Sequence, residues 1–366
     1  MPEVQDIFNA VSLSGLSPDQ CKALSAIKCC RTRVLGSHVD KCHSCGHLEV
    51  SFNSCRNRHC PKCQGSKQIE WVHAQLSKLL PVSYFHVVFT LPDQLNTLIY
   101  QNQRLLYSLL LKCAGETLTE LTQDPKYLGA QSGATVILHT WGQNLSFHPH
   151  VHCIVPGGGL SYDGLRFLSS GRKFFIPVKV LSRKFRGKFL FYLKQAWQNG
   201  QIKFFSAAAT LGYGVNFLNF LDCLYSFDWV VFCQKPFKSP AVVVKYLGRY
   251  THRVAIANSR IIKVDENGVT FRWKDYKDKA KVKLMTLSPE EFARRFLLHV
   301  LPTGFTRIRH YGLLSSRNLM TKLALCFRLT DGLSVVFEFS RFVKRCPLCG
   351  GLVAFAGLVI TNSPVP

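Results

Sequence analysis

The sequence is poor in acidic residues and contains no long apolar run. Its 366 residues include 21 Asp and Glu against 46 Lys and Arg. No run approaches the roughly 20 apolar residues that a membrane-spanning helix needs, so no membrane association is expected. The first residues, 1–6, are acidic and polar, which is unlike a secretory signal. The chain also lacks internal repeats and low-complexity tracts, so we expect a folded protein of the cytoplasm.

The excess of positive charge is spread along the whole chain. The formal net charge is +25, and 47% of the residues are hydrophobic. A chain of this length can bury a large core and form two or three domains. A distributed cationic surface favours a polyanionic partner, and nucleic acid is the default inference.

The fifteen cysteines are unevenly distributed, since eight of them lie between Cys21 and Cys63. In a reducing compartment, clustered thiols indicate metal binding more often than disulfides. Two Cys-x2-Cys motifs are separated by 14 residues, which is a zinc-ribbon spacing. We therefore predict a structural Zn²⁺ bound by the four cysteines of these motifs, Cys42, Cys45, Cys60 and Cys63.

Other potential ligands surround these motifs. Cys30, His38, Cys55 and His59 could form a second zinc site. Basic residues alternate with them, and a metal-stabilised module of this kind suits DNA contact; the DNA-binding candidates here are Arg56 and Arg58. Near the end of the chain, Cys346 and Cys349 form a lone Cys-x2-Cys motif. No second pair follows it, so the sequence assigns no metal to that motif.

The segment His148-Pro149-His150-Val151-His152 opens a short apolar run that ends in glycines. The run predicts a buried strand, on which the three histidines point to one face. Imidazoles beside an apolar core are costly unless they are ligated or hydrogen-bonded. The pattern indicates a metal site, although satisfied core histidines would give the same pattern.

Other local patterns predict further elements. The β-branched and aromatic run 84–90 predicts a central strand, and Asp93 can cap a long helix after it. Asn267-Gly268 between alternating apolar runs predicts a hairpin.

A third ligand can come from the preceding predicted strand, 134–139. If the two strands are antiparallel neighbours, His139 faces the His150 and His152 pair. Three protein ligands leave coordination positions open for substrate, as a catalytic metal requires. His148 competes for the third position and Gln143 is a weaker option; we favour His139 because Pro149 can turn His148 away.

Ser239 and Pro240 are typical of a helix start, and the helix that they predict carries Tyr246 and Tyr250. Tyrosines four residues apart leave the same helix face. A phenol is a competent nucleophile toward phosphorus when a metal and arginines neutralise the phosphate. The further DNA-binding candidates are the neighbouring Arg249 and Arg253 and, in a later basic patch, Arg307 and Arg309.

Together these residues resemble the two-tyrosine rolling-circle insertion-sequence transposases of the HUH (His-hydrophobe-His) endonuclease superfamily. The resemblance runs from about residue 20 to about residue 315. The segments that carry it are 53–63, Phe85-His86-Val87-Val88-Phe89-Thr90-Leu91-Pro92, His148-Pro149-His150-Val151-His152, Tyr246-Leu247-Gly248-Arg249-Tyr250 and Arg307-Ile308-Arg309-His310-Tyr311-Gly312.

The resemblance implies an α+β fold, in which an antiparallel sheet flanked by helices follows a small N-terminal zinc-ribbon-like domain. Within that sheet, a central strand would carry the histidine pair and a helix the tyrosines. We expect four regions: a Cys-rich zinc-binding domain at 1–70, a catalytic domain at 71–258, a basic α+β extension at 259–340 and a tail at 341–366.

The resemblance also implies an enzyme that acts on DNA near the bacterial nucleoid. His150, His152 and a third ligand would hold a catalytic Mg²⁺ or Mn²⁺. Tyr246 and Tyr250 would cleave single-stranded DNA at the element's ends and at the target, through a 5′-phosphotyrosine, and rejoin it. Two alternatives remain at this stage. A plasmid replication initiator or relaxase shares the chemistry, and a zinc-dependent DNA-binding regulator would need neither the histidines nor the tyrosines.

Overall fold

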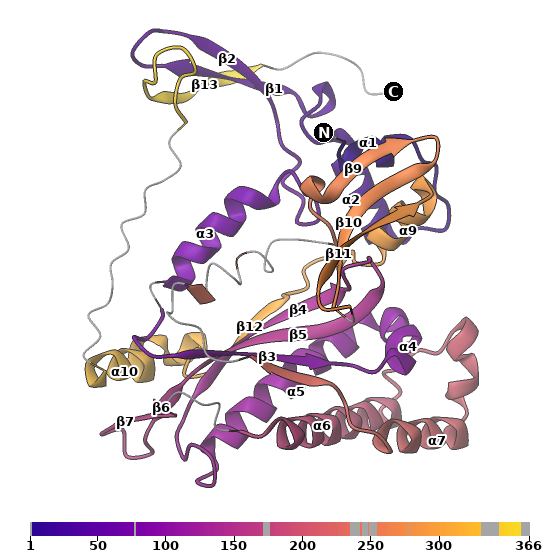
Figure 1. Ribbon diagram of the computed structural model, residues 1–366, viewed down its shortest axis with the longest axis vertical. Helices are drawn as coiled ribbons and strands as arrows, with labels where there is room; N and C mark the ends of the chain where they lie inside the picture. The colour runs from indigo at the N-terminus through magenta and orange to yellow at the C-terminus, as the bar shows by residue number, and fades with distance from the viewer. Residues whose placement is uncertain are drawn as a thin grey trace.

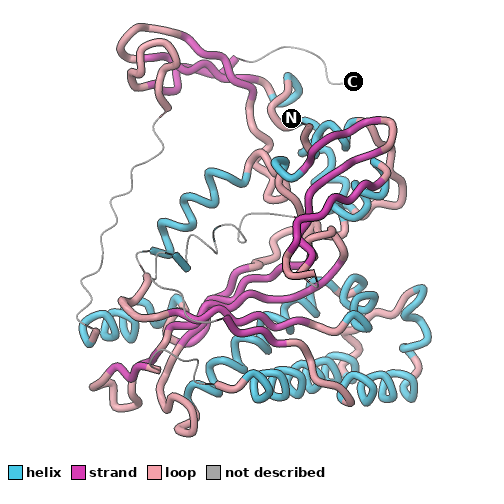
Figure 2. Tube along the Cα trace, in the orientation of Figure 1, coloured by secondary structure: helices cyan, strands magenta, loops and turns pink. Residues whose placement is uncertain are grey.

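The computed structural model describes residues 2–76, 78–170, 176–234, 242–243, 248, 255–276, 278–330 and 344–359. Antiparallel sheets flanked by helices make up the described parts (Figures 1 and 2), which confirms the predicted fold class.

The largest sheet has five strands in the order β12-β4-β5-β3-β8, and every neighbouring pair is antiparallel. The predicted strands at 84–90, 134–139 and 148–155 are its three central members, because β-branched and aromatic runs suit a sheet buried on both faces. Their bounds are β3 Tyr84–Thr90, β4 Gly133–Trp141, β5 Phe147–Pro156, β8 Val231–Gln234 and β12 Ile308–Gly312.

One face of this sheet packs on long helices and forms the main core (Figure 1). Alternate strand residues such as Val87, Val136 and Val151 point into that core and are fully buried. Trp229, just before β8, joins the same core against Phe185 and Phe189. The helices on this side are α4 Asn96–Gln101, α5 Gln103–Gln123, α6 Val178–Gln198 and α7 Gly214–Tyr225.

The opposite face of the central sheet carries the histidines. Tyr84, Ile137 and Ile154 form a small apolar cluster on this face together with Val243. Trp71 of α3 (Gln64–Leu76) packs against the same cluster, and Figure 1 shows α3 on the side of the sheet away from α5 and α6.

A second sheet has the order β11-β10-β9, and the turn between β9 and β10 is the predicted Asn267-Gly268 hairpin. It shares one hydrophobic core with helices from the beginning of the chain. Phe8 meets Phe296 edge to face at 5.3 Å between ring centroids. The elements of this unit are α1 Val4–Asn9, α2 Pro18–Cys29, β9 Ile261–Asp265, β10 Gly268–Asp275, β11 Lys281–Leu287 and α9 Pro289–Leu297.

A third, smaller sheet joins the two ends of the chain. It has the order β13-β1-β2, and in Figure 1 the yellow β13 lies beside the indigo β1 and β2. The strands are β1 Ser37–Cys42, β2 Leu48–Phe52 and β13 Val353–Val359.

The remaining described elements are short. They are the hairpin β6 Gly158–Leu160 and β7 Phe167–Ser169, the helix α10 Ala324–Leu329, the π-turn Leu319–Leu323, and five short 3-10 turns, Arg33–Leu35, Asp93–Leu95, Ser206–Gly212, Asn258–Arg260 and Ser316–Asn318. Within the described ranges, every helix is too short or too polar to cross a membrane.

Candidate active site and metal centres

The central strands bring His139, His150 and His152 together. β4 and β5 are antiparallel, and His139 pairs directly with His150 across the ladder. The candidate ligand nitrogens of the three rings all lie within 4.8 Å of one another. The Nε2 atoms of His150 and His152 are 3.1 Å apart. Two nitrogens bound to one ion at about 2.1 Å each would be separated by about this distance.

Hydrogen bonds on the far side of each ring orient the pair. Nδ1 of His150 donates to the carbonyl oxygen of His148 at 2.7 Å. Nδ1 of His152 lies 2.8 Å from Nε2 of His86 on the neighbouring strand β3. A hydrogen bond donated by Nδ1 fixes the tautomer whose Nε2 atom can bind a metal; the carbonyl of His148 sets this tautomer for His150, and His86 can accept such a bond from His152.

Burial keeps these imidazoles neutral. Desolvation lowers the pKa of His150 to about 4 and that of His152 well below its ordinary value, and the neighbouring histidines add repulsion of positive charge. At neutral pH both side chains therefore present lone pairs without first losing a proton. The donor set fits a divalent ion that accepts nitrogen ligands.

The two alternative third ligands are not part of this group of nitrogens, although the ring centroids of His148 and His150 are only 5.3 Å apart. Nδ1 of His148 is 3.6 Å from Oδ1 of Asp93, at the surface. Gln143 lies beyond the end of β4, and its backbone carbonyl accepts a hydrogen bond from Arg260. His139 is buried and stacks on Trp141, with ring centroids 4.5 Å apart. The geometry thus brings together the three residues that the sequence favoured.

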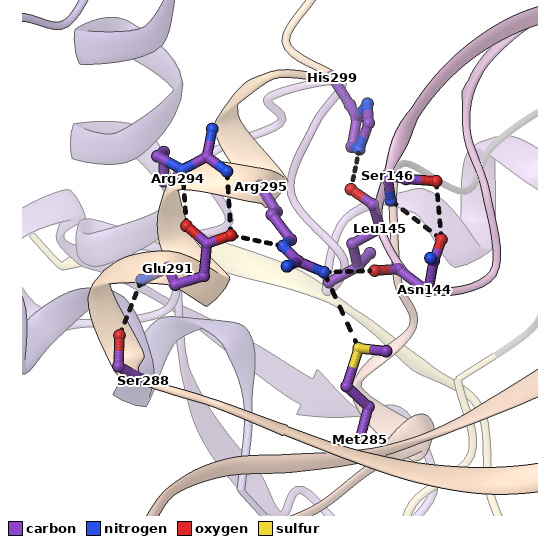
Figure 3. Close-up of polar contacts among 9 residues, drawn as sticks. All are labelled: Asn144, Leu145, Ser146, Met285, Ser288, Glu291, Arg294, Arg295 and His299. Carbon is purple, nitrogen blue, oxygen red and sulfur yellow. Dashed lines mark hydrogen bonds and ion pairs between the residues drawn. The ribbon is translucent and has the colours of Figure 1, made fainter. Parts of the chain in front are cut away.

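Polar contacts from α9, and from His299 just after it, hold the turn between β4 and β5 (Figure 3). Nε2 of the buried His299 donates to the carbonyl of Leu145 at 3.2 Å, and Nη1 of Arg295 donates to the carbonyl of Asn144 at 3.3 Å. Glu291 binds the guanidinium groups of Arg294 and Arg295. The pKa of its carboxyl group is about 2, lowered by hydrogen bonds from Arg294 and Arg295 against the effect of burial.

The predicted nucleophiles Tyr246 and Tyr250, and the neighbouring Arg249 and Arg253, lie outside the described residues. Two described residues flank Tyr246. Val243 is fully buried against Ile137 and Ile154 on the histidine face of the sheet. A Cβ atom at Gly248 would collide with Cγ2 of Val72 on α3.

Eight of the fifteen cysteines form two groups of four, and this grouping differs from the predicted one. Cys60 and Cys63 lie with Cys30 and Cys55, whereas Cys42 and Cys45 lie with Cys346 and Cys349. The predicted set Cys42, Cys45, Cys60 and Cys63 is thus divided, because the β1–β2 hairpin carries the first motif away from the start of α3. In the first group, Sγ of Cys63 is 3.5 Å from that of Cys30 and 3.7 Å from that of Cys55.

His38 and His59, predicted to join a second zinc site, belong to neither group of described residues. Nδ1 of His38 is 2.8 Å from Oδ1 of Asn53. His59 is buried, and its Nε2 accepts a hydrogen bond from the backbone N–H of Leu301 at 3.0 Å. Desolvation lowers the pKa of His59 to about 3. Instead of joining a cysteine group, His38 hydrogen-bonds to Asn53 and His59 to the backbone of Leu301.

Two predicted DNA-binding arginines point inward. Arg307 is 7% exposed, and burial lowers its pKa to about 9. Arg58 donates to the carbonyl of Phe305 at 2.6 Å, and burial lowers its pKa as well. Arg309 is half-buried and donates to Oγ of Ser108 at 2.9 Å. Arg56 is the exposed member of the four.

A groove that sequence reasoning missed lies beside the histidine cluster. It runs from Trp141 to the exposed side of β10, and it combines aromatic with basic side chains. Trp141 at its inner end is the same ring that stacks on His139. The residues that line it are Trp141, Gln143, Ala255, Ile256, Ala257, Arg260, Arg272, Trp273, Lys274, Tyr276 and Val282.

Comparisons with known proteins cover most of the chain. The family described as "Putative transposase" matches residues 133–320, and a "Transposase zinc-binding domain" of IS91 type matches residues 3–91. The "Putative transposase y4qJ" of Sinorhizobium fredii (strain NBRC 101917 / NGR234) is 48% identical over 340 residues, which span 91% of this chain and 85% of the relative.

A more distant relative is the transposase for insertion sequence element IS801 of Pseudomonas savastanoi pv. phaseolicola. It is 28% identical over 361 residues, covering 94% of this chain and 85% of the relative. No solved structure matches the chain significantly.

The fold and the site define a class of protein. An antiparallel sheet flanked by helices, with a His-hydrophobe-His strand at its centre, is the arrangement of the HUH endonuclease superfamily, and here it is joined to a cysteine-rich module that matches a transposase zinc-binding domain. Within that class, the chain belongs to the IS91-type transposase family. A transposase acts on DNA, so the partner of this chain is DNA. Membership of this family favours the transposase interpretation over the two alternatives, a replication initiator and a DNA-binding regulator.

Proposed function

We propose that the protein nicks and rejoins single-stranded DNA at the ends of a mobile element, in rolling-circle transposition, through a 5′-phosphotyrosine intermediate. The observation that carries this proposal is the pair of converging Nε2 atoms, 3.1 Å apart, on a buried strand. A regulator that only binds DNA has no use for such a pair. Family membership supports the same conclusion, because a transposase must cleave and join strands.

His150, His152 and His139 would hold the catalytic ion, which we propose is Mg²⁺ or Mn²⁺. When bound, the ion acts as a Lewis acid that neutralises charge on the scissile phosphate. His86 keeps His152 in the required tautomer, and the carbonyl of His148 does the same for His150. Since Mg²⁺ prefers oxygen ligands, three imidazoles favour Mn²⁺ over Mg²⁺ at equal concentration.

Tyr246 and Tyr250 are the proposed nucleophiles. The flanking contacts support this assignment, since Val243 packs on the same face of the sheet that carries the histidines. The close approach of Gly248 to Val72 supports it too, because α3 also covers that face. Val243 and Gly248, the described residues on either side of Tyr246, are therefore both on the histidine side of the sheet.

The proposed cleavage is a transesterification. The phenolate oxygen of one tyrosine forms a bond to phosphorus, and the bond from phosphorus to the 3′ oxygen breaks. The phenol loses a proton and the departing 3′ oxygen gains one, so no water or energy source is consumed. The 5′-phosphotyrosine is later attacked by a 3′-hydroxyl, which restores both the phosphodiester and the tyrosine.

The groove beside Trp141 is the proposed path of the single strand toward the histidines. Single-stranded DNA binds where cationic side chains follow the backbone and aromatic rings stack on bases. Exposed Arg272 and Lys274 alternate along β10 with Trp273, and Tyr276 follows at its end. Trp141 links this groove to His139.

A covalent-adduct assay tests the proposal. The purified protein is incubated with Mn²⁺ and with single-stranded DNA that carries the element's ends and is labelled either at its 3′ end or, for comparison, at its 5′ end, and denatured protein is examined for retained label. We expect an adduct that retains the label located 3′ of the nick. The double variant Tyr246→Phe, Tyr250→Phe and the single variant His150→Ala should abolish it.

Tyr213→Phe is the matched control, because Tyr213 is 72% exposed and lies directly before α7, a helix on the face of the sheet opposite the histidines. It should form the adduct at the wild-type level. DNA binding without any adduct in the wild-type protein would contradict the proposal and restore the non-catalytic regulator. Loss of label in the Tyr213 variant would mean that the assay reports folding rather than chemistry.

A further inference from the structure

The lone C-terminal motif that sequence analysis could not interpret has the same local structure as the N-terminal one. In the first motif, N–H of Gly46 donates to the carbonyl of Cys42 at 3.0 Å, and Gly46 has φ 75°. In the second, N–H of Gly350 donates to the carbonyl of Cys346 at 2.9 Å, and Gly350 has φ 72°. A left-handed glycine directly after the second cysteine thus closes both turns in the same way.

The next hydrogen bond repeats as well. N–H of Cys42 donates to the carbonyl of His47 at 2.8 Å, and N–H of Cys346 donates to the carbonyl of Gly351 at 2.9 Å. Each turn is a complete zinc knuckle that presents two thiols on one side. Cys60 and Cys63 are built differently, because Cys63 leads directly into α3 without a glycine turn.

The two knuckles face each other with their sulfur atoms at metal-binding separations. Sγ of Cys42 is 3.5 Å from Sγ of Cys349, and Sγ of Cys45 is 3.7 Å from Sγ of Cys346. Four sulfurs at 2.3 Å from a tetrahedral Zn²⁺ are separated by about 3.8 Å. All four cysteines are free thiols rather than disulfides.

The surrounding contacts fix the knuckles in this orientation. β13 pairs antiparallel with β1 from Ser37 to Cys42, with a shift of register between Val39 and Asp40, and N–H of His43 donates to the carbonyl of Leu352 at 2.9 Å. Nζ of Lys344 lies 2.8 Å from Asp40 and 3.1 Å from Glu49. A Cβ atom at Gly351 would lie 2.8 Å from Cβ of Ser44 and 3.1 Å from Sγ of Cys42, so the close approach of the knuckles favours glycine there.

This small sheet has almost no apolar core of its own. The apolar side chains of β2 are exposed, Val50 by 63% and Phe52 by 45%, and Phe355 of β13 is 63% exposed. The cysteines Cys42 and Cys346, in contrast, are buried. Modules with so little buried apolar surface generally depend on a metal for stability.

We propose that Cys42, Cys45, Cys346 and Cys349 form a second structural Zn²⁺ site, distinct from the group Cys30, Cys55, Cys60 and Cys63. The ion would tie the C-terminal segment to the N-terminal zinc-binding module across 307 residues of sequence. The C-terminal motif is then half of a zinc ribbon whose other half lies near the start of the chain.

The zinc content of the purified protein tests the proposed second site directly. The full chain, purified without added metal, should contain about two zinc ions per molecule by mass spectrometry of the metal. The double variant Cys346→Ser, Cys349→Ser should contain about one, and so should Cys30→Ser, Cys55→Ser. Cys223→Ser is the matched control, because Cys223 is an exposed cysteine on α7, and it should retain two.

A second experiment remains decisive if a cysteine variant folds poorly. A protease site is introduced within 331–343 of the full chain, the purified protein is cut, and size-exclusion chromatography follows the fragment that contains residues 344–359. Zinc linkage predicts that this fragment co-elutes with the remainder and separates after a chelator is added. In the cut Cys346→Ser, Cys349→Ser variant it should separate without the chelator.

Either of two results would overturn the proposal. One is a wild-type chain with a single zinc that the Cys346 and Cys349 variant retains in full. The other is a cut fragment that stays bound after every zinc ion has been removed, which would show that strand pairing alone joins the ends.

Discussion

His86 is a buried polar residue in the largely apolar strand β3, and its contact with His152 explains why a histidine occurs there. Its Nε2 atom lies 2.8 Å from Nδ1 of His152, and the two rings are stacked with centroids 5.0 Å apart. It therefore acts as a positioning residue, since it touches a candidate ligand and not the metal itself. Partners of this kind commonly change metal affinity by 10- to 100-fold.

Replacing His86 with Phe should lower the affinity for the divalent ion by about 10-fold or more. Titration of adduct formation with Mn²⁺ would show this as a higher midpoint, with a similar maximal yield. His86→Gln keeps a hydrogen-bonding atom and should recover part of the affinity. An unchanged midpoint in the Phe variant would show that His152 needs no partner.

His299 makes stability depend on pH. Its Nδ1 accepts from Thr140 at 3.2 Å and its Nε2 donates to Leu145, and burial lowers its pKa to about 4 from an ordinary 6.5. Between these values the unfolded chain binds a proton that the folded chain does not. The free energy of unfolding therefore falls as pH decreases from about 6.5 to 4, by up to about 1.4 kcal/mol per pH unit from this residue.

Urea unfolding at several pH values would measure this dependence. His299→Gln should lower stability at neutral pH and make the slope between pH 6.5 and 4 shallower by up to one proton. Thr140→Val removes one hydrogen bond but keeps the imidazole, so it should keep most of the slope. Equal slopes in the wild type and His299→Gln would refute the assignment.

At the scale of elements, the edge strand β12 depends on a glycine at its end. Gly312 has φ 59°, and a Cβ atom there would collide with the carbonyl oxygen of Ser132 and the Cα atom of Gly133, next to the start of β4. This close approach aligns β12 with β4, the strand that carries His139.

Gly312→Ala should cost more stability than Gly304→Ala. Both positions have positive φ, and the strain of alanine in that region is on the order of 1 kcal/mol. Gly304 has open space around its Cα atom, whereas Gly312 does not. Denaturant titration should give a difference of about 1 to 3 kcal/mol between the two variants, and equal losses would mean that β12 shifts freely.

The main strands and the histidine cluster could be predicted from sequence, because local patterns specify them. Apolar runs and glycine turns predicted β3, β4 and β5, and the period of two placed His150 and His152 on one face. The long helix predicted after Asp93 is divided at Asn102 into α4 and α5, where Asn102 binds the backbone of Lys203. That contact is distant in sequence, so no local pattern reveals it.

At the scale of the whole molecule, the spacing of the cysteine motifs gave the wrong grouping, because the fold decides which cysteines lie together. Two Cys-x2-Cys motifs 14 residues apart suggested one zinc site, yet each completes a different group. One sequence feature separates the motifs correctly: a glycine follows Cys45 and Cys349, whereas none follows Cys63. Likewise, charge alone did not distinguish the buried Arg307 from the exposed Arg272, because both occur in basic stretches.

The groove beside Trp141 predicts how DNA affinity depends on salt. Removing two phosphate contacts with Arg272→Ala, Lys274→Ala should weaken binding to single-stranded DNA for all sequences. It should also reduce the slope of log affinity against log salt by about 1.4. Fluorescence anisotropy at several salt concentrations would measure both effects.

The matched control is Arg183→Ala, Lys194→Ala, which removes two exposed charges from α6. That helix covers the face of the sheet opposite the histidines, so the slope should change little. A similar loss in both variants would indicate diffuse attraction to the positive surface and would refute a defined groove.

The pairing of β1 with β13 also has a consequence for the order of assembly. A ribosome makes Cys42 and Cys45 long before Cys346 and Cys349, so the nascent chain carries an incomplete knuckle and an unpaired edge of β1 throughout the synthesis of the catalytic sheet. Only a chain translated through β13, to residue 359, can close this sheet. Polypeptides from prematurely terminated copies of the element would keep that edge open, which exposes them to aggregation and proteolysis and distinguishes them from full-length protein before any DNA is bound.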